Sequence, residues 1–434
     1  MVGRAEVVVV GAGIGGLAAA KELRGRGLHV TLLDAENYTT FQPLLFEAAT
    51  AMVAAEDVVT PVHVLARGWR DVTFRMGRAN GIDWDRHRIR LSDGDELAFD
   101  FLVLAPGVAS TYHHVPGAQQ YAVPLKTVSD AIRLRNSVLR AFEQAAAHPA
   151  DVAEGATSVV IVGGGSSGVE TAGYLADFLI PTLADDHPQL DPTATRITVL
   201  ELGDRLLPTF HPDLSAYAAK ALRRRGVDVR FNTEVRAVDE RGVTLVDGTR
   251  VLASTVVWAA GVTAPAWISR LGLPMQGGRV AVGDDLRLAA HADTFVVGDL
   301  ATIRDRNGSP VGQVAQAALQ SGRHAGRQIA RIIAGQPTEP LRYRDKGSMA
   351  IVGRYAAVMQ SGRLRLTGML AWIAWGLLHL AFLPGLVNRL SVAQKWRMWH
   401  LTGRSPSRVL LEVPPGPAPK GVGQPVRSAV GQGQ

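Results

Sequence analysis

A glycine-rich turn lies between an apolar strand and a helix near the start of the chain. Residues 6–10 are one acid followed by four valines, which is typical of a strand buried on both faces of a parallel sheet. Gly11-Ala12-Gly13-Ile14-Gly15-Gly16 follows directly, and an apolar pattern of helical period runs on to Leu28. A second apolar run, residues 30–33, ends in Asp34. This order of strand, glycine turn, helix, strand and acid predicts a Rossmann-like dinucleotide-binding unit.

Each position of this turn has its own role in the binding of a dinucleotide. Gly11 permits the tight turn, Gly13 lets the backbone approach a pyrophosphate, and Gly16 lets the helix pack closely on the strand. The helix N-terminus offers free N–H groups and partial positive charge to the phosphates. Asp34 can accept hydrogen bonds from an adenosine ribose. The alternative is a glycine turn without a ligand, and the complete order of elements favours the nucleotide.

The same pattern recurs in the middle of the chain. Residues 158–162 predict a strand, and a turn rich in glycine follows at residues 163–168. Gly163, Gly165 and Gly168 take the three glycine roles of the first unit. Two glycine turns of this kind predict two bound nucleotides that face each other.

An acid also closes the second unit. An expected helix, residues 169–179, is followed by an insertion that begins at Pro181, and then the predicted strand 196–200 ends in Glu201. The gap from the first glycine to this acid is 38 residues, against a usual gap of about twenty. We interpret Glu201 as the acceptor for ribose hydroxyls that repels a 2′-phosphate, which predicts a preference for NADH over NADPH. Arg205 keeps NADPH open as the alternative.

Two further strand ends indicate that the first unit is split. Residues 101–104 predict a strand that ends before Gly107, and residues 294–297 predict one that ends at Gly298-Asp299. An acid after a strand, at the carboxyl edge of a parallel sheet, lies where such folds bind ligands. An Asp in a turn is also a common cap, so Asp299 alone does not decide between the two.

We therefore predict an α/β protein with two Rossmann-like dinucleotide-binding domains, the first of which is split by the inserted second domain. A strand at residues 256–259, followed by Ala260-Gly261, returns the chain to the first domain. The expected segments are residues 1–117 and 266–345 for the first domain, 118–265 for the second, 346–411 for a C-terminal membrane anchor, and 412–434 for a disordered tail.

The absence of cysteine excludes several kinds of redox protein. The chain contains none. This rules out disulfides, thiolate metal sites and iron–sulfur clusters, and it rules out enzymes that pass electrons through a dithiol or a cysteine persulfide. No metal site is predicted, because His113-His114 is interpreted as a surface turn rather than a ligand pair.

The net charge of +7 is concentrated near the C-terminus. Between Lys346 and Leu411 there are nine Lys or Arg residues and no Asp or Glu. Residues 368–387 are uncharged, and residues 388–404 mix basic side chains with Leu and Trp. An amphipathic basic segment with tryptophan predicts monotopic attachment to an anionic lipid surface, rather than a span or a nucleic-acid site. The same apolar face could form a subunit interface, and we expect a homodimer.

Together these features resemble the pyridine-nucleotide flavoprotein disulfide-reductase-like superfamily. Within it, the chain is most similar to the type II, non-proton-pumping NADH:quinone oxidoreductases, over about residues 5–410. The more specific pieces are Phe41-Gln42-Pro43 and the pair Gln316 and Gln320, because glycine turns occur in many flavoenzymes. The resemblance implies FAD in the first domain, NADH in the second, and electron transfer to a membrane quinone (menaquinone or ubiquinone). With no signal peptide, the expected location is the cytoplasmic face of the bacterial inner membrane.

The resemblance also assigns roles to individual residues. It implies that Gln316 and Gln320 line the quinone pocket and that Lys346 lies near the flavin. Glu170 is either a first-turn acid that the helix dipole favours or a group near the nicotinamide. The implied catalytic set is Glu170, Gln316, Gln320 and Lys346, and the implied cofactor-binding set is Gly11, Gly13, Gly16, Asp34, Gln42, Gly107, Gly163, Gly165, Gly168, Glu201, Gly261, Gly298 and Asp299.

Three positions depart from the pattern of the family. Pro106 stands where threonine is commoner, and Ser166-Ser167 replaces a Pro-Thr pair. Glu47 replaces the usual glutamine, a change that could alter the pocket near the flavin or the quinone. None of the three removes a required function.

The glutamine pair lies on a helix expected at residues 313–333. Gln316 and Gln320 are four residues apart and so lie on one face of it. Amides can donate to quinone carbonyls and accept from the quinol without becoming charged. The N-terminus of this helix would direct positive charge toward the flavin. Without the resemblance, the ordinary interpretation is that these glutamines face water.

Two rival functions use the same two folds. A soluble NADH-dependent reductase of ferredoxin or rubredoxin would have no reason to carry the basic, tryptophan-rich end. A flavin-based redox sensor would bind NADH with little turnover, and steady NADH oxidation with a short-chain quinone would exclude this alternative. Sulfide:quinone reduction needs cysteines, which this chain lacks.

Overall fold

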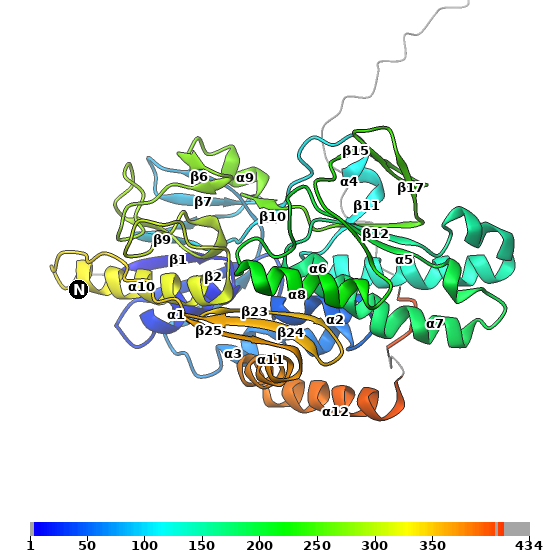
Figure 1. The fold of residues 1–434 in the computed structure, drawn as a ribbon. Helices are drawn as coiled ribbons and strands as arrows, with labels where there is room; N and C mark the ends of the chain where they lie inside the picture. The colour runs from blue at the N-terminus through cyan, green and yellow to red at the C-terminus, as the bar shows by residue number, and fades with distance from the viewer. Residues whose placement is uncertain (1–3, 404–406, 412–434) are drawn as a thin grey trace, which may run out of the picture.

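The computed structural model describes residues 4–403 and 407–411, and Figure 1 shows two sheets side by side above a pair of C-terminal helices. The first sheet has the strand order β22-β9-β1-β2-β5, and all neighbouring pairs are parallel. The four valines of β1 are buried, as expected for a central strand covered on both faces. The strands are β1 (Glu6–Val10), β2 (His29–Asp34), β5 (Val72–Met76), β9 (Phe101–Leu104) and β22 (Thr294–Val296).

The second sheet is also parallel throughout, with the order β11-β18-β12-β13-β14. Its strands all lie, in sequence, between β9 and β22 of the first sheet. They are β11 (Ala122–Pro124), β12 (Val159–Val162), β13 (Ile197–Leu200), β14 (Asp228–Arg230) and β18 (Thr255–Trp258). The predicted α/β class, with one Rossmann-like unit inserted into another, is confirmed.

Two connections join the sheets and pair with each other. β10 (Ala109–Ser110) follows the first sheet, β19 (Val262–Thr263) follows the second, and the two strands are antiparallel. The indole of Trp258 donates to the carbonyl oxygen of Thr111 at 2.7 Å, which ties the outgoing connection to the end of β18. The paired connections hold the carboxyl ends of β9 and β18 next to each other.

The sequence analysis did not predict the antiparallel meanders. The described residues form three of them, each with three strands. They are β6 (Ala79–Asp83), β7 (Arg88–Leu91) and β8 (Glu96–Ala98); β15 (Val235–Asp239), β16 (Gly242–Leu245) and β17 (Arg250–Leu252); and β23 (Ser348–Gly353), β24 (Ala356–Ser361) and β25 (Leu364–Thr367). The third meander lies between the nucleotide-binding helices and the C-terminal helices (Figure 1).

The helices α1 (Ile14–Leu23) and α10 (Ala315–Ile333) cross in direct backbone contact. A Cβ atom on Gly322 would overlap the carbonyl oxygen of Gly15, and one on Gly326 would lie 2.9 Å from that of Ala19. Only glycine permits this approach. The first helix ends at Leu23 rather than at Leu28 as the apolar pattern suggested, because Gly25 and Gly27 follow with left-handed backbone angles.

The helix after the second glycine turn continues through Pro181, where we expected an insertion to begin. α6 (Ser166–Tyr174) passes into a π-helical turn (Leu175–Leu179) and then into α7 (Ile180–Asp186). Pro181 has no N–H to donate to the carbonyl of Asp177, and a widened turn accommodates the missing bond.

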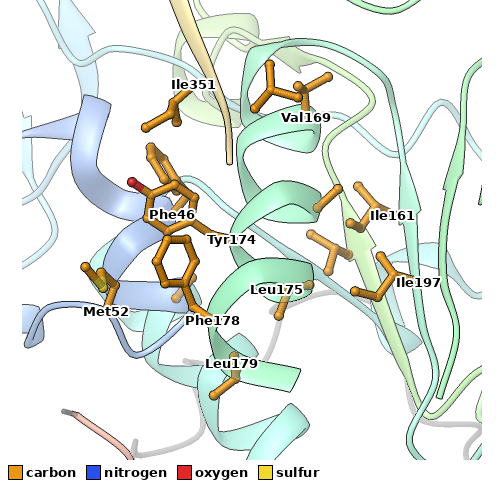
Figure 2. Close-up of a cluster of buried hydrophobic side chains, with 14 of the residues drawn as sticks. Phe46, Met52, Ile161, Val169, Tyr174, Leu175, Phe178, Leu179, Ile197 and Ile351 are labelled. Atoms are coloured by element: carbon orange, nitrogen blue, oxygen red, sulfur yellow. The ribbon is translucent and has the colours of Figure 1, made fainter. Parts of the chain in front are cut away.

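The largest apolar core lies around α6. Figure 2 shows Tyr174 and Phe178 of this helical segment beside Phe46, and Val169 and Leu175 toward the strands of the second sheet. Phe46, on α2 (Leu45–Ala49), meets Tyr174 edge-to-face at 4.8 Å. This core therefore joins a segment of the first unit to the second unit.

Two helices follow the third meander, α11 (Gly368–Phe382) and α12 (Leu386–Thr402). Pro384 and Gly385 separate them, and Gly385 has a φ of +84° that ends the helical path. Among the described residues, no helix combines the length and the apolar character needed to cross a bilayer. The predicted tail, residues 412–434, lies outside the described residues.

The tryptophans of these helices do not face outward, as the sequence analysis expected of interfacial residues. Trp375 and Trp399 are buried, and Trp372 and Trp396 are half-buried. Trp396 and Trp399 lie on the side of α12 that packs on the core, and Trp399 contacts Phe178 with ring centroids 4.1 Å apart. The tryptophans dock the helices onto the protein, and aliphatic side chains occupy the outer face.

The remaining helices and strands include α5 (Val128–Ala147), whose apolar face belongs to the largest core, and several shorter elements. The shorter elements are β3 (Tyr38–Thr40), η1 (Gln42–Leu44), η2 (Ala55–Val58), β4 (Val59–Pro61), α3 (Val62–Leu65), α4 (Ala118–Tyr121), η3 (Pro149–Glu154), η5 (Pro192–Ala194), α8 (Pro212–Arg223), α9 (Ala266–Ser269), β20 (Met275–Gln276), β21 (Arg279–Val280) and η6 (Gly298–Leu300).

Candidate active site

The first glycine turn has a packed side and an open side. Gly11 has a φ of +103°, and a Cβ atom there would overlap the carbonyl oxygen of Ala105. A Cβ atom on Gly16 would overlap the carbonyl oxygen of Gly11. At Gly13 a Cβ atom would meet nothing within 4 Å. Gly11 and Gly16 are thus needed for packing, and Gly13 leaves space in front of the N-terminus of α1.

Asp34 closes this turn from the end of β2. Its Oδ2 accepts from the backbone N–H of Ala12 at 2.5 Å, and its Oδ1 accepts from that of Glu36 at 2.9 Å. Burial raises the pKa of Asp34, against the effect of these backbone donors. A carboxylate can accept about four hydrogen bonds, so ribose hydroxyls can still be bound.

The second glycine turn repeats this geometry. Gly163 has a φ of +110°, and a Cβ atom there would lie 2.5 Å from the carbonyl oxygen of Ala259. Gly168 packs on the carbonyl of Gly163 as Gly16 packs on that of Gly11, and Gly165 faces open space. The same three positions therefore serve packing and ligand approach in both units.

Glu201 takes the place of Asp34 in the second unit. Its Oε2 accepts from the N–H of Gly164 at 2.5 Å, and its Oε1 accepts from that of Gly203 at 2.7 Å. The long insertion has not moved this acid away from the turn. Arg205 directs Nη2 to the carbonyl oxygen of Pro208 at 3.3 Å.

The two turns fit a dinucleotide on structural grounds. In each, a helix N-terminus is open in front of a glycine without neighbours, and a carboxylate lies beside the turn. Pyrophosphate and ribose are the two groups that such a cradle accommodates. Among the described residues no group of acids and histidines could hold a metal ion. His113 and His114 form a turn with positive φ angles, as predicted, and His113 Nε2 lies 2.8 Å from the carbonyl oxygen of Ala260.

Residues after the strands of both sheets meet between the two units. Asp299, in η6 after β22, has its Oδ2 3.6 Å from the Nζ of Lys126. Gln42 donates to the carbonyl oxygen of Lys126 at 2.9 Å, and Gln313 donates to that of Asp299 at 3.1 Å. Gly298 has a φ of +70°. The structure thus brings Gln42 and Asp299 together, as two of the predicted cofactor residues.

The sequence analysis missed Lys126. It follows β11, and β11 runs parallel to β18, so Lys126 lies beyond the carboxyl edge of the second sheet. The strand-end rule that selected Asp299 would have found it, but a three-residue strand gives no clear signal in the sequence. Gly107 and Gly261 lie after β9 and β18, with φ angles of +70° and +130°.

The two glutamines of α10 hold the segment that leads to the third meander. Gln316 donates to Asp345 Oδ1 at 3.1 Å and to the carbonyl oxygen of Gly347 at 3.0 Å, and it accepts from the N–H of Lys346 at 2.9 Å. Gln320 donates to the carbonyl oxygen of Arg344 at 2.9 Å and accepts from its N–H at 3.0 Å. The glutamines share one face, as predicted, and they fix the backbone of Lys346, whose side chain is exposed.

Glu170 lies in a buried polar cluster. Its Oε1 accepts from the N–H of Ile351 on β23 at 3.3 Å, and burial raises its pKa well above the ordinary value. One helical turn along α6, Tyr174 donates to Oε1 of Glu47 at 3.1 Å. Both acids and the tyrosine are buried. Glu170 and Glu47 were both noted in the sequence, but the bond of Tyr174 to Glu47 was not predicted.

Comparison with known proteins places this geometry in a family. Residues 5–322 match the pyridine nucleotide-disulphide oxidoreductase family. The chain is 34% identical over 413 residues to the type II NADH:quinone oxidoreductase NdhA of Mycobacterium tuberculosis. This alignment covers 91% of this chain and 87% of NdhA. This chain is a type II NADH:quinone oxidoreductase by family. The predicted resemblance is confirmed.

A bacterial relative and a solved structure agree with this placement in the type II NADH:quinone oxidoreductases. The Staphylococcus epidermidis enzyme is 30% identical over 358 residues, covering 81% of this chain and 88% of that protein. The fold matches NDH2 from Plasmodium falciparum in complex with NADH with a TM-score of 0.84 at 18% identity, over 93% of this chain and 99% of that one. The family match spans both glycine turns. It confirms the prediction from the sequence that FAD is the cofactor and NADH the substrate.

Proposed function

We propose that this protein is a monotopic membrane flavoenzyme that transfers electrons from NADH through FAD to a membrane quinone without pumping protons. The observation that carries the proposal is the pair of matching cradles, one in each unit, whose strand ends meet at Lys126 and Asp299. Relatives named type II NADH:quinone oxidoreductase support the reaction.

FAD is held by the first unit. The turn around Gly13 takes the pyrophosphate, Asp34 takes the adenosine ribose, and Gln42 and Asp299 face the flavin end. When bound, FAD supplies the two-electron chemistry between NADH and quinone. The protein positions the reacting groups and sets the charge around them.

NADH is held by the second unit. Gly165 faces the pyrophosphate, and Glu201 accepts from the ribose hydroxyls. The position of Glu201 at the turn supports the predicted preference for NADH over NADPH. Arg205 donates one N–H to the carbonyl oxygen of Pro208 and keeps its other donors, so it remains the residue that would favour NADPH. Glu170 is the proposed acid near the nicotinamide.

The quinone site is proposed at the N-terminal half of α10. Gln316 and Gln320 line it, and they fix the segment that carries Lys346. Because the glutamines bond to this segment, we propose that α10 and residues 344–347 together form one wall of the quinone site. A quinone that entered from the membrane would then meet a preformed polar edge.

The outer face of α11 and α12 is the proposed membrane surface. It exposes large apolar side chains at 43% or more of their area, whereas the tryptophans of the same helices are buried or half-buried. These are Met369, Leu370, Ile373, Leu377, Leu378, Phe382, Leu386, Val387, Leu390, Met398 and Leu401. Monomeric proteins rarely expose so continuous a patch.

Positive charge borders this apolar surface. Arg363, Arg365 and Arg397 are exposed, and residues 346–411 contain no acid. An anionic lipid surface matches both the apolar area and the charge. We propose attachment at the cytoplasmic face of the inner membrane. A homodimer is the second proposed assembly, and it would cover part of the same surface.

One anaerobic experiment tests the reaction. The purified yellow protein is mixed with NADH and then with a short-chain quinone, and the flavin absorbance is followed. We expect the absorbance to fall with NADH and to recover with the quinone. A colourless protein that does not take up FAD, or a reduced flavin that the quinone fails to reoxidise, would overturn the proposal.

A further inference from the structure

Glu47 lies where α2, α6 and α12 meet, and its side chain is fully buried. Reduction of a quinone by NADH consumes a proton, because NADH supplies one hydride and the quinol also needs one further proton. We propose that Glu47 stores this proton inside the protein and supplies it toward the quinone, with Tyr174 as its hydrogen-bonded partner. The inference rests on the proposed function and names the source of a proton that the function requires.

Both oxygens of Glu47 have a donor. Tyr174 Oη lies 3.1 Å from Oε1, and Trp396 Nε1 lies 2.8 Å from Oε2. The two donors stabilise the carboxylate after the proton has left. A tyrosine hydroxyl can also accept, so Tyr174 can bond to the protonated acid as well. The site therefore accommodates Glu47 in both states, which a proton store requires.

The acidic groups that face Glu47 disfavour its charged form. On α6, Glu170 is a second buried carboxyl, and Tyr174 lies one helical turn from it. On η2, Asp57 adds negative charge and is itself paired with Lys395 of α12. Ionisation of both carboxyls in one apolar core has a high free-energy cost, because each is desolvated and the two charges repel each other.

The basic groups on the packed elements do not neutralise Glu47. Within the described residues it has no ion pair. Arg135 of α5 is buried, and burial lowers its pKa, while the charge that acts on it is that of Glu56. Burial lowers the pKa of His379 on α11 and so disfavours its charged form, and its ring stacks on Trp375.

These surroundings set the protonation of Glu47 near neutral pH. Burial raises the pKa of Glu47 to about 8, although the bonds from Trp396 and Tyr174 act in the opposite direction. The acid therefore carries a proton at pH 7 and can release it at modest cost. A general acid works best when its pKa lies near the working pH.

Glu47 also lies between the flavin side and the proposed membrane side. Its helix α2 continues directly from η1, where Gln42 contacts the backbone of Lys126. Trp396 belongs to α12, whose other face carries the exposed leucines. Glu47 is thus connected along the chain to η1, which carries Gln42, and through Trp396 to the helix of the proposed membrane surface.

Infrared spectroscopy of the oxidised holoenzyme tests the storage directly. We expect the band of a protonated carboxyl to titrate with a midpoint near pH 8 in the wild type. Glu47→Gln should remove this titrating band, while Glu56→Gln, an exposed acid on η2, should keep it. A band that persists unchanged in Glu47→Gln would overturn the proposal, whatever the protein catalyses.

Half-reaction kinetics test the delivery. In Glu47→Gln we expect the reoxidation of the flavin by a short-chain quinone to slow roughly tenfold at pH 7 and to lose its decline near pH 8. Reduction by NADH should be unchanged in both variants, and Glu56→Gln should behave as the wild type. An identical pH profile in Glu47→Gln would overturn the inference and leave the proposed function standing. Failure of the wild type to reduce quinone would instead overturn the function, and the infrared titration would still report on Glu47.

Discussion

Trp396 on α12 donates its indole N–H to Oε2 of Glu47 on α2, 349 residues away in sequence, at 2.8 Å. This bond joins a helix of the proposed membrane surface to a buried acid of the first unit. Three more polar side chains of α12 contact residues that follow α2 in the sequence. Asn388 donates to the carbonyl oxygen of Val59 at 2.6 Å, and Ser391 and Lys395 bond to Asp57. The helix is therefore attached through specific contacts as well as through apolar packing.

Replacement of Trp396 by phenylalanine should make Glu47 harder to deprotonate. The indole N–H stabilises the carboxylate, so its removal raises the pKa of Glu47 further above 8. The midpoint of the infrared titration should move to higher pH, and the free energy of unfolding should fall by about 1–2 kcal/mol. Trp372→Phe, on α11, is the matched control. A midpoint that stays in place would show that the bond does not act on the acid.

Glu47 should make the stability of the protein depend on pH. Its pKa is about 8 in the folded protein and 4.5 by ordinary value, so the folded state binds this proton more tightly. The contribution of Glu47 to stability therefore falls as pH rises from about 4.5 to about 8, and it is level outside this window. Relative to the wild type, Glu47→Gln should gain up to about 5 kcal/mol across the window. Urea denaturation at several pH values measures this, and a constant difference between the two proteins would contradict it.

Replacement of Glu201 by alanine should relax the choice of nicotinamide nucleotide. The variant loses an acceptor for the ribose and the charge that repels a 2′-phosphate, and it leaves two turn N–H groups without their partner. We expect the ratio of kcat/KM for NADH over NADPH to fall at least about tenfold. Asp204→Ala, an exposed acid nearby, should leave the ratio unchanged. Unchanged selectivity in Glu201→Ala would remove this residue from its role.

Removal of both α10 glutamines should affect only one half-reaction. Gln316→Ala with Gln320→Ala frees the 344–347 segment, so reoxidation of the flavin by quinone should slow about tenfold or more. Flavin reduction by NADH should remain as in the wild type. Gln336→Ala, exposed beyond the end of α10, is the control. Stopped-flow traces that slow equally in both half-reactions would argue against a separate quinone pocket.

The membrane surface should be tested by substitution rather than by deletion. Removal of the chain after Gly362 would expose the core on which Trp375 and Trp399 pack. It would also remove Trp396, the hydrogen-bond donor to Glu47. Leu377→Gln with Leu386→Gln and Leu390→Gln changes only exposed side chains. We expect flotation with vesicles containing phosphatidylglycerol to fall at least about tenfold, and Val246→Gln, exposed on the second unit, to have no effect. Unchanged flotation together with loss of a dimer would show that the surface is a subunit interface.

Local patterns in the sequence carried most of the fold and the nucleotide sites. Gly11, Gly16 and Asp34 could be predicted because strand, turn, helix and acid are neighbours in sequence, and backbone geometry alone decides their roles. The second unit followed in the same way, and its acid stayed in place despite the insertion.

Contacts between distant segments could not be predicted in this way. A tryptophan in a basic amphipathic helix suits a lipid interface and a protein core equally well, and only the packing against Phe178 decides for the core. Glu47 was recognised as unusual, but its pairing with Tyr174 and Trp396 depends on where three separate helices meet. Lys126 follows a strand too short to give a pattern.

The backbone contact of α1 with α10 has a mechanical consequence. At Gly322 and Gly15 no side chain lies between the helices to absorb a displacement. In the proposed arrangement, α1 presents its first turn to the pyrophosphate of FAD, and α10 holds residues 344–347 through its glutamines. We therefore expect a shift of α1 to move α10 and the proposed acceptor wall with it, so that cofactor occupancy and the shape offered to the electron acceptor vary together.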